Sequence, residues 1–169
     1  MTRAATSPGL RPFLPTDAHA VAQLFRASIE ELAAEDYDED QREAWASAAD
    51  DEAAFAARLA QNLTILALID GEIAGFISLK DNASVDMLYV HPEMARQGVG
   101  AALLDAIEKL ATNRGAQKLD VDASDAARDF FASRGYVAQS RNTVTIADQW
   151  LGNTTMTKEL AAPAVGRPH

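Results

Sequence analysis

The segment Met87–Leu104 joins an apolar run to an amphipathic helix through a short loop that contains two glycines. The apolar run is predicted to be a strand, and it ends at Pro92, which has no N–H to donate within a sheet. Beyond Gly98 the apolar residues recur at helical spacing as far as about Asn113. A strand that passes so directly into a helix favours a fold in which helices pack on a sheet.

The loop between this strand and this helix has the chemistry of a phosphate site. The first turn of a helix presents unpaired N–H groups and the positive end of the helix dipole. Gly98 and Gly100 have no side chain to obstruct a phosphate, and Arg96 adds a positive charge. Two common phosphate loops fit less well, because Ala-Ala rather than Lys-Ser/Thr follows Gly100 and Leu103 replaces a third glycine. Simple packing of helix on strand is the alternative explanation of the glycines.

The first half of the chain is predicted to be helical and then to form hairpins. Residues 1–8 are expected to be a frayed leader, followed by a short strand at Leu10–Leu14. Asp70-Gly71 is the strongest hairpin signal in the chain, and Asp81-Asn82 predicts a second turn. Periodicity predicts a helix over Ala18 to about Ala34 and a second helical region over Gln41–Ala49 and Asp51–Gln61. Strands are then predicted over Leu63–Ile69, Ile73–Leu79 and Ser84–Val90.

The remainder is predicted to alternate strand and helix and then to end in two strands. These elements are a strand over Lys118–Asp122, a helix over Ser124–Arg134, and strands over Tyr136–Ile146 and Thr154–Leu160. Asp120 and Asp122 share one face of the strand over Lys118–Asp122, where they either line an acceptor cleft or cap the helix that follows, and we expect Asp122 to be a cap. We therefore predict an α/β (α+β) fold with one domain over residues 1–160 and a loose tail over residues 161–169. Its sheet is expected to be mixed, mostly antiparallel, of six to seven strands, with about four flanking helices.

Charge is distributed unevenly along the 169 residues. The formal net charge is −10, and eleven of the 25 acidic residues lie between residues 30 and 52, where Arg42 is the one base. Such a chain is a poor candidate for binding nucleic acid, which requires a basic face. The acidic segment is either a solvated helix face or a surface that attracts a cationic substrate.

Composition also bears on metals, membranes and compartment. Cysteine is absent, which excludes disulfides and a thiolate nucleophile, and three scattered histidines do not suggest a metal site. No apolar run approaches the roughly 20 residues of a membrane helix, and Met1–Gly9 has no apolar core of a secretory signal. We expect a cytoplasmic protein with no metal and no membrane partner.

In combination, these motifs resemble the GNAT superfamily of acetyl-CoA-dependent N-acetyltransferases. The resemblance rests first on the strand ending Leu88-Tyr-Val-His-Pro92, then on the loop Arg96-Gln-Gly-Val-Gly100 and its helix. Downstream, Ala123–Tyr136 is similar to the family's next helix, which commonly reads Ala-x-x-x-Tyr-x-x-x-Gly-Phe. The parts that resemble one bacterial subgroup are Asp36-Tyr37, Gln41, Ala44-Trp45-Ala46 and the final strand at Asn153–Leu160. The match spans roughly residues 9–160.

The resemblance implies a binding site for acetyl-CoA. The strand backbone would bind the pantetheine arm in the manner of an added strand, and the loop would bind the pyrophosphate through its N–H groups. Ser124 stands where the family often has an asparagine near the thiol end of the cofactor. The implied cofactor-binding residues are Leu88, Tyr89, Val90, Arg96, Gln97, Gly98, Val99, Gly100, Ala101, Ser124 and Phe131.

Two positions depart from the family pattern. Ala95 occupies the first Gln/Arg position of the loop motif, although Arg96 and Gln97 follow it directly. Phe131 stands where many members have a tyrosine that is thought to protonate the leaving thiolate, and phenylalanine has no proton to give. Another group, water, or unassisted departure of the thiolate would have to serve instead.

Asp86 and Tyr37 are the predicted catalytic residues. Acetyl transfer to an amine requires loss of the ammonium proton, stabilisation of the oxyanion and departure of sulfur. For the oxyanion, the resemblance implies the N–H of Val90. Asp86 lies in an otherwise apolar strand and is predicted to be the base, unless it simply faces water. Tyr37, in the acidic loop, is predicted to donate to the thiolate or to orient the acceptor, with packing as the alternative.

We therefore expect an enzyme, monomer or homodimer, that moves an acetyl group from acetyl-CoA to a primary amine of a small molecule or peptide. The alternative is an acetyl-CoA-binding sensor or regulatory module with little transfer activity, which Phe131 favours. Release of free CoA thiol in the presence of amines would distinguish the two.

Overall fold

The computed structural model describes residues 7–161, and its centre is a mixed seven-stranded sheet. The strand order is β1-β2-β3-β4-β5-β7-β6, with β4 and β5 parallel and the other neighbours antiparallel. The strands are β1 (Gly9–Pro12), β2 (Leu63–Ile69), β3 (Glu72–Lys80), β4 (Ser84–Val90), β5 (Lys118–Ser124), β6 (Val137–Ile146) and β7 (Gln149–Glu159). The predicted α+β fold and its mostly antiparallel sheet are confirmed.

Five α-helices flank the sheet within the described residues, one more than expected. They are α1 (Ala18–Leu32), α2 (Glu39–Ala46), α3 (Glu52–Gln61), α4 (Val99–Asn113) and α5 (Arg128–Ser133). The acidic region contributes two of these because it carries two separate start signals. Asp38 accepts a hydrogen bond from the N–H of Gln41, and Asp51 accepts one from the N–H of Ala54. Each aspartate thereby caps its own helix.

Two tight hairpins set the register of β2, β3 and β4, as the turn signals predict. Asp70 and Gly71 have φ of 51° and 80°, the left-handed pair that a type I′ turn requires. Asp81 and Asn82 repeat that geometry at the next turn, with φ of 55° and 53°. The predicted leader falls largely on residues 1–6, and the predicted tail largely on residues 162–169, which lie outside the described part.

The last strand begins earlier than predicted, at Gln149 instead of Thr154. Gly152 suggests a turn when the sequence is considered alone, but it lies inside β7 opposite Thr143. A β-carbon at Gly152 would collide with the guanidinium of Arg141, so the glycine marks a close approach of a side chain. The β6–β7 turn itself is made by Ala147 and Asp148, both with positive φ.

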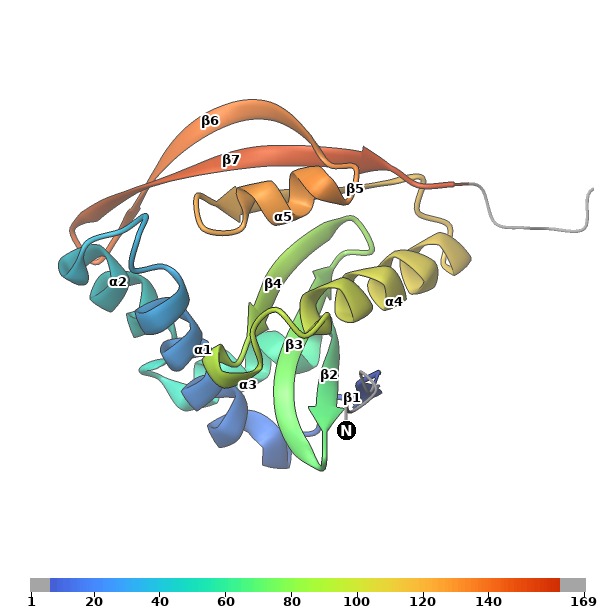
Figure 1. Cartoon of the computed structure of the whole chain (residues 1–169), viewed down its shortest axis with the longest axis horizontal. Coiled ribbons are helices and arrows are strands. Elements are labelled where there is room, and N and C mark those ends of the chain that lie inside the picture. The colour runs from blue at the N-terminus through green and yellow to red at the C-terminus, as the bar shows by residue number, and fades with distance from the viewer. Residues whose placement is uncertain (1–6, 162–169) are drawn as a thin grey trace, which may run out of the picture.

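The helices cover the two faces of the sheet in separate hydrophobic clusters. On one face α4 buries Leu103 and Ile107 against β2, β3 and β5. On the other, α1 and α3 bury Phe25 and Phe55 against β3 and β4. Figure 1 shows this division, with α4 on the side of the sheet away from α1 and α3. The face-alternating apolar residues of β3 and β4 supply both clusters.

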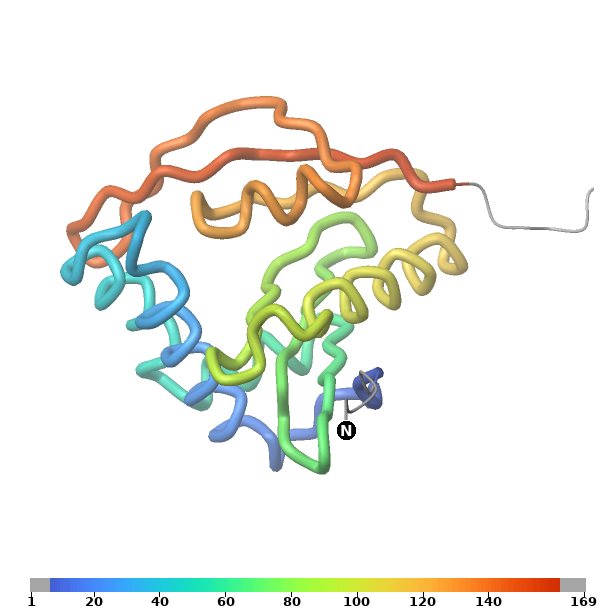
Figure 2. The backbone as a smooth tube through the Cα atoms, viewed as in Figure 1, coloured from blue at the N-terminus to red at the C-terminus, as the bar shows by residue number. Residues whose placement is uncertain are grey.

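The sheet opens in its middle, between β4 and β5. These strands are paired at Ser84–Asp120 and Val85–Val121, and the described residues show no ladder pair beyond that point. The trace of Figure 2 shows the two strands running apart, with the loop after α1 meeting the far end of β7. The molecule therefore has one half built on β1–β4 and another built on β5–β7 and α5 (Figure 1).

Candidate active site

The separation of β4 and β5 leaves backbone groups of β4 exposed at its edge. The N–H of His91 donates to the carbonyl of Ala74 in β3, at 2.8 Å. Because successive N–H groups of a strand point to opposite edges, those of Leu88 and Val90 point away from β3. They face the space that β5 has left, and a ligand with amide groups can pair with them as an added strand would.

A cavity of about 580 Å³ occupies that space and reaches the start of α4. A smaller cavity of about 140 Å³ adjoins it nearer to where β4 and β5 meet, and Leu88, Tyr89 and Ser124 line both. The larger cavity is lined by Ser28, Ile29, Leu32, Ala33, Trp45, Leu88, Tyr89, Val90, Ala95, Arg96, Gly98, Val99, Gly100, Ala101, Ser124, Ala126, Ala127 and Phe130.

The start of α4 offers free donors to this larger cavity. The first intrahelical hydrogen bond runs from the N–H of Ala102 to the carbonyl of Gly98, so the N–H groups of Val99, Gly100 and Ala101 precede it. Gly98, the N-cap residue, has φ of 79° and no capping side chain. Arg96 has φ of 64°, which turns the backbone toward the helix start. Backbone donors at the positive end of a 15-residue helix form a site for a phosphate group.

Nine of the eleven predicted cofactor residues line the larger cavity. The two exceptions are Gln97, whose side chain is exposed and bonds to the carbonyl of Glu93, and Phe131. Phe131 lines the smaller cavity instead, 2% exposed and edge-on to Tyr136. Sequence reasoning missed the wall contributed by α1 and by Phe130, whose ring lies 3.4 Å from where a β-carbon of Gly100 would be. No motif in the sequence of α1 predicts that it lines the cavity.

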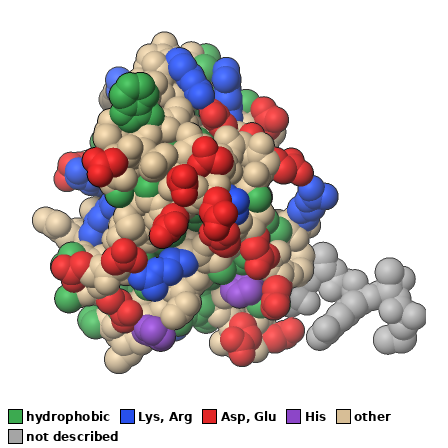
Figure 3. Space-filling model, turned by 90° about the vertical axis from the view of Figure 1, so that its left-hand side faces the viewer, with side chains coloured by type: hydrophobic (Ala, Val, Ile, Leu, Met, Phe, Trp, Pro, Cys, Tyr) green, Lys and Arg blue, Asp and Glu red, His purple; other side chains and the backbone are tan. Residues whose placement is uncertain are grey.

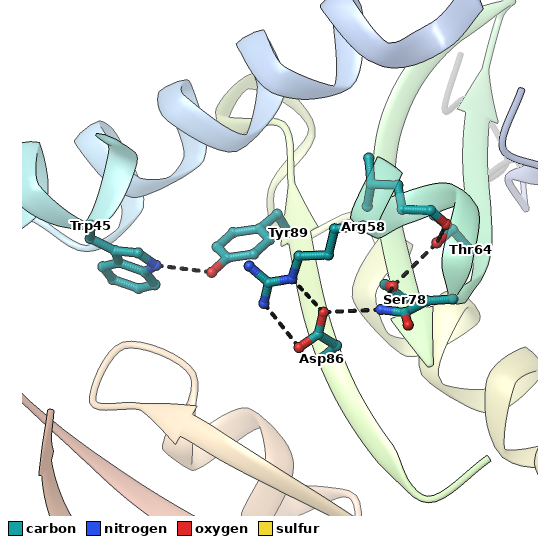
Figure 4. A network of polar contacts seen from close by, with 8 residues as sticks. Trp45, Arg58, Thr64, Ser78, Asp86 and Tyr89 are labelled. Carbon is teal, nitrogen blue, oxygen red and sulfur yellow. Dashed lines mark hydrogen bonds and ion pairs between the residues drawn. The ribbon is translucent and has the colours of Figure 1, made fainter. Parts of the chain in front are cut away.

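A β-bulge places Asp86 on the same face of the sheet as Met87. Ser78 of β3 pairs with Met87 and Leu79 pairs with Val85, so Asp86 is the extra residue. Its carboxylate receives two hydrogen bonds from Arg58 of α3, at 2.8 and 2.9 Å. A third comes from Asn62 at 3.1 Å (Figure 4). Asp86 lines the smaller cavity, and its role as the base stays a prediction.

The same network continues into the core on the α3 side. The amide of Asn62 also donates to the hydroxyl of Ser78, which lies 3.2 Å from the hydroxyl of Thr64. Thr64 gives its one proton to the carbonyl of Leu59 at the end of α3, so the Ser78 hydroxyl is the donor to Thr64. Figure 4 shows this chain running from the bulge to β2. It fixes the bulge against α3 and thereby fixes the edge of β4 that faces the cavities.

Aromatic side chains close the site on the α1–α2 side. The indole of Trp45 donates to the hydroxyl of Tyr89 at 3.1 Å (Figure 4). The hydroxyl of Tyr37 donates to the carbonyl of Gly152 and accepts the N–H of Asp125 at 2.8 Å. Burial raises the pKa of Tyr89 and of Tyr37 above the ordinary value, so both stay protonated at neutral pH. The role of Tyr37 as a proton donor stays a prediction.

Asp122 does not cap a helix, contrary to expectation. It lies inside β5, and α5 begins only at Arg128 with no capping side chain. Its carboxylate lines the smaller cavity and accepts a hydrogen bond from Thr155 at 2.7 Å. Ser124, two residues further, lines both cavities and accepts the N–H of Ala127.

The acidic segment forms an exposed face beside the site. Figure 3 shows acidic side chains gathered on the side of the molecule that carries α1 and α2. A groove of about 850 Å³ lies there, and its acidic lining residues are Glu30, Glu39, Asp40, Glu43 and Asp50. Arg26 and Arg42 bond to Asp50 and Glu30, which partly neutralises the face. Solvation and attraction of cations are both compatible with this arrangement.

Residues 7–161 contain neither a helix that could span a membrane nor a group of side chains that could hold a metal ion. None of the helices is long and apolar enough to cross a membrane. No three histidine, cysteine or acidic side chains in this part of the chain are grouped so that they could hold a metal ion.

Comparisons with known proteins agree on one family. A model described as "Acetyltransferase (GNAT) domain" matches residues 33–160. The uncharacterized N-acetyltransferase YafP of Escherichia coli K12 is 31% identical over 147 residues, which is 87% of this chain and 93% of YafP.

Solved structures extend the agreement to the fold. A GCN5-related N-acetyltransferase from Rhodopseudomonas palustris is 58% identical with a TM-score of 0.91, covering 95% of this chain and all of that one. PaiA N-acetyltransferase from Thermoplasma acidophilum, solved with coenzyme A, is 19% identical with a TM-score of 0.75. The match covers 91% of this chain and 99% of PaiA, and at that identity it bears on the fold alone.

Proposed function

This chain belongs to the GNAT acetyltransferase family, and we propose that it transfers an acetyl group from acetyl-CoA to a primary amine of a small molecule or peptide. Family membership makes it an N-acetyltransferase. The class of acceptor, a primary amine, goes beyond what family membership shows. One observation carries the cofactor assignment: the unpaired edge of β4 and the uncapped start of α4 line one continuous cavity.

Each part of acetyl-CoA has a matching surface in that cavity. The pantetheine amides fit the free N–H and carbonyl groups of Leu88 and Val90, and the pyrophosphate fits the N–H groups that follow Gly98. Arg96 adds a charge on the phosphate side. Solved relatives of the same fold point the same way, since PaiA was solved with coenzyme A and YncA from Salmonella typhimurium with acetyl-CoA.

The reaction proceeds where the two cavities meet. With the pantetheine along β4, the thioester reaches the smaller cavity, and the N–H of Val90 is a donor for the oxyanion as the carbonyl is attacked. The acceptor nitrogen approaches from the smaller cavity, whose lining includes the carboxylates Asp86 and Asp122. Either Asp86 or another carboxylate there removes the proton, and Tyr37 remains the candidate donor to the thiolate.

A sensor that binds acetyl-CoA without efficient transfer is the competing function. Phe131 favours it, because it is buried at the smaller cavity and has no proton to donate. A melting experiment with acetyl-CoA, NAD and ATP tests binding first. At 100 times Kd a ligand adds about 2.7 kcal/mol, or roughly 5–10 °C for a chain of this size.

Free-thiol release then separates enzyme from sensor. The chain is mixed with acetyl-CoA and a panel of primary amines, and the appearance of CoA thiol is followed with time. Amine-dependent release supports the transferase. A melting shift with acetyl-CoA alone and no release with any amine supports the sensor, and no shift rejects the phosphate loop itself.

A further inference from the structure

Two aspartates lie side by side where β4 and β5 separate, and they differ in what already binds them. Val85 and Val121 form the last pair of the parallel ladder, so Asp86 and Asp122 are the next residues on the two strands. Both line the smaller cavity. We infer that Asp122 is the carboxylate that binds the acceptor ammonium and takes its proton, an inference that rests on the proposed function.

Asp86 is occupied by partners of its own chain. Three N–H groups, two from Arg58 and one from Asn62, already point at its two oxygens. A carboxylate has about four lone-pair sites, so little capacity remains for a substrate. The arginine also cancels the charge that would attract an ammonium ion. Figure 4 shows Arg58 lying between Tyr89 and Asp86.

Asp122 is held in place and keeps an oxygen free. The amide of Asn142 donates to the hydroxyl of Thr155, and that hydroxyl donates to Oδ1 of Asp122, each at 2.7 Å. Within residues 7–161, Oδ2 has no hydrogen bond, and no lysine or arginine forms an ion pair with Asp122. The polar chain from β6 and β7 therefore orients the carboxylate without neutralising it.

The walls of the smaller cavity indicate what the ammonium is attached to. Its apolar lining includes Trp45 of α2, Val144 and Ile146 of β6, and Leu151 of β7. Its volume of about 140 Å³ is enough for a group the size of a benzene ring, since a cavity of about 150 Å³ holds benzene. The lining also includes the polar side chains of Asp86, Ser124 and Asn153. A carboxylate beside such an apolar wall fits a primary amine on a short apolar or aromatic stem.

The proposed step balances in protons and electrons. The ammonium gives one proton to Oδ2 of Asp122, and the freed lone pair attacks the acetyl carbonyl carbon. The C–S bond then breaks as the oxyanion re-forms the carbonyl. The second proton of the nitrogen leaves with the sulfur as CoA thiol, and Asp122 returns its proton to water.

The test compares Asp122→Asn with Asp86→Asn and with Asp120→Asn as the matched control. Asp120 is on the same face of β5, bonded to Ser84, and does not line the cavity. Benzylamine, butylamine and a lysine-bearing peptide serve as acceptors, with thiol release as the readout. Asp122→Asn should lower kcat/KM for benzylamine at pH 7 by about 100-fold, the scale of a lost base. Its melting shift with acetyl-CoA should be unchanged.

Further measurements distinguish a loss of proton transfer from a structural disturbance of the site. The deficit of Asp122→Asn should shrink at pH values near the pKa of the amine, where free amine is abundant. Asp120→Asn should stay within about twofold of the parent, and Thr155→Val, which removes the orienting hydroxyl, should lose less than Asp122→Asn. Benzylamine should exceed the peptide in kcat/KM.

Other results would overturn the inference. An Asp122→Asn protein within about threefold of the parent, or a deficit relieved by high pH in Asp86→Asn instead, removes Asp122 from the reaction. A higher kcat/KM for the peptide than for benzylamine would reject the inference that the acceptor carries its amine on an apolar stem. If the unaltered chain binds acetyl-CoA but releases no thiol with any amine, the proposed function fails as well.

Discussion

Gly98 is the residue on which the cofactor assignment depends most directly. It begins α4 in the left-handed region, with φ of 79°, and beyond the adjoining backbone no atom of residues 7–161 lies within 4 Å of where its β-carbon would be. The space is therefore open on the side where a phosphate would lie against the helix start. A glycine elsewhere with the same backbone conformation provides a control for strain.

Gly98→Glu is expected to abolish the melting shift caused by acetyl-CoA, because a negative side chain would occupy the phosphate position. Gly71→Glu is the matched control. Gly71 has φ of 80° and equally open surroundings, but it lies in the β2–β3 turn. Both variants should lose a similar amount of intrinsic stability, about 1 kcal/mol. A Gly98→Glu protein that keeps the shift would show that the loop is packing only.

The pairing of Arg58 with Asp86 makes a separate prediction about stability. Asp86 has a side chain 17% exposed, and Arg58 is 48% exposed. Arg58→Met leaves the carboxylate with Asn62 alone and should cost about 1–3 kcal/mol in the free energy of unfolding, less than for a fully buried pair. Urea unfolding measures this difference in the free energy of unfolding.

The double variant Arg58→Met/Asp86→Asn is the control for that prediction. Without the carboxylate, loss of the arginine leaves no charge unpaired, so the double variant should be more stable than Arg58→Met. Equal or lower stability of the double variant would mean that Arg58 contributes through its packing on Tyr89 and not through the ion pair.

At the scale of elements, the bulge in β4 decides which side chains meet the cavity. Simple alternation along Ser84–Val90 places Asp86 opposite Met87, whereas the bulge puts both on one face. The bulge depends on the partner strand and on the hydrogen bonds from α3. The strand itself was predictable from its composition, but this local break in its period was not.

The β6–β7 hairpin depends on a glycine that accommodates an arginine. Gly152→Ala is expected to lower the free energy of unfolding by about 1 kcal/mol, since a β-carbon would push the guanidinium of Arg141 out of its exposed ion pair with Asp125. Arg141 bonds to Asp125 and Thr154, so it cannot move without loss. Thermal and urea unfolding both report the change.

Removing the arginine supplies the control. In an Arg141→Ala background, Gly152→Ala should cost less than about 0.5 kcal/mol, or even stabilise the strand, because alanine suits a strand better than glycine. Equal costs in both backgrounds would place the strain elsewhere in the hairpin. This dependence on a partner eleven residues away is why Gly152 alone suggested a turn.

At the scale of the whole molecule, Tyr37 links the two halves of the sheet. From the loop after α1, its hydroxyl reaches Gly152 in β7 and the N–H of Asp125 after β5. β4 and β5 share just two ladder pairs, so this contact is a second junction between the halves. It also lines the smaller cavity, the proposed binding site of the acceptor.

Tyr37→Phe should destabilise the chain by about 1–2 kcal/mol, because a carbonyl and an N–H lose their partner. If Tyr37 also protonates the thiolate, kcat should fall by about 10–100-fold with the KM for acetyl-CoA little changed. Tyr136→Phe is the control, since its buried hydroxyl donates to Glu108 away from the thioester. An unchanged kcat in Tyr37→Phe would leave the tyrosine a structural link.

Parts of the site that are close together along the chain could be predicted from the sequence, and parts that are far apart could not. The strand, loop and helix of the proposed cofactor site are continuous over Met87–Leu104, so composition and spacing were enough to predict these elements, and the family resemblance implied their role. The wall from α1, the Arg58–Asp86 pair and the Tyr37–Gly152 bond join residues between 28 and 115 positions apart. Such contacts depend on how elements pack, and no local pattern encodes them.

Acid stability of the whole chain should depend on Asp17 at the start of α1. Arg11 of β1 bonds to both carboxylate oxygens and, with the N–H of Leu14, holds the pKa of Asp17 below its ordinary value of about 3.8. A carboxylate whose pKa is lower in the folded chain stabilises it fully above the unfolded pKa. That contribution is lost as the pH falls through the lower folded pKa.

Asp17→Asn should therefore melt roughly 3–6 °C below the parent at pH 7, and the two melting curves should converge as the pH falls below about 3.8. Asp129→Asn is the control, because Asp129 is exposed on α5 and has no side-chain bond among residues 7–161. It should follow the parent at every pH. A difference between Asp17→Asn and the parent that persists unchanged into acid would mean that Asp17 acts through its shape and not its charge.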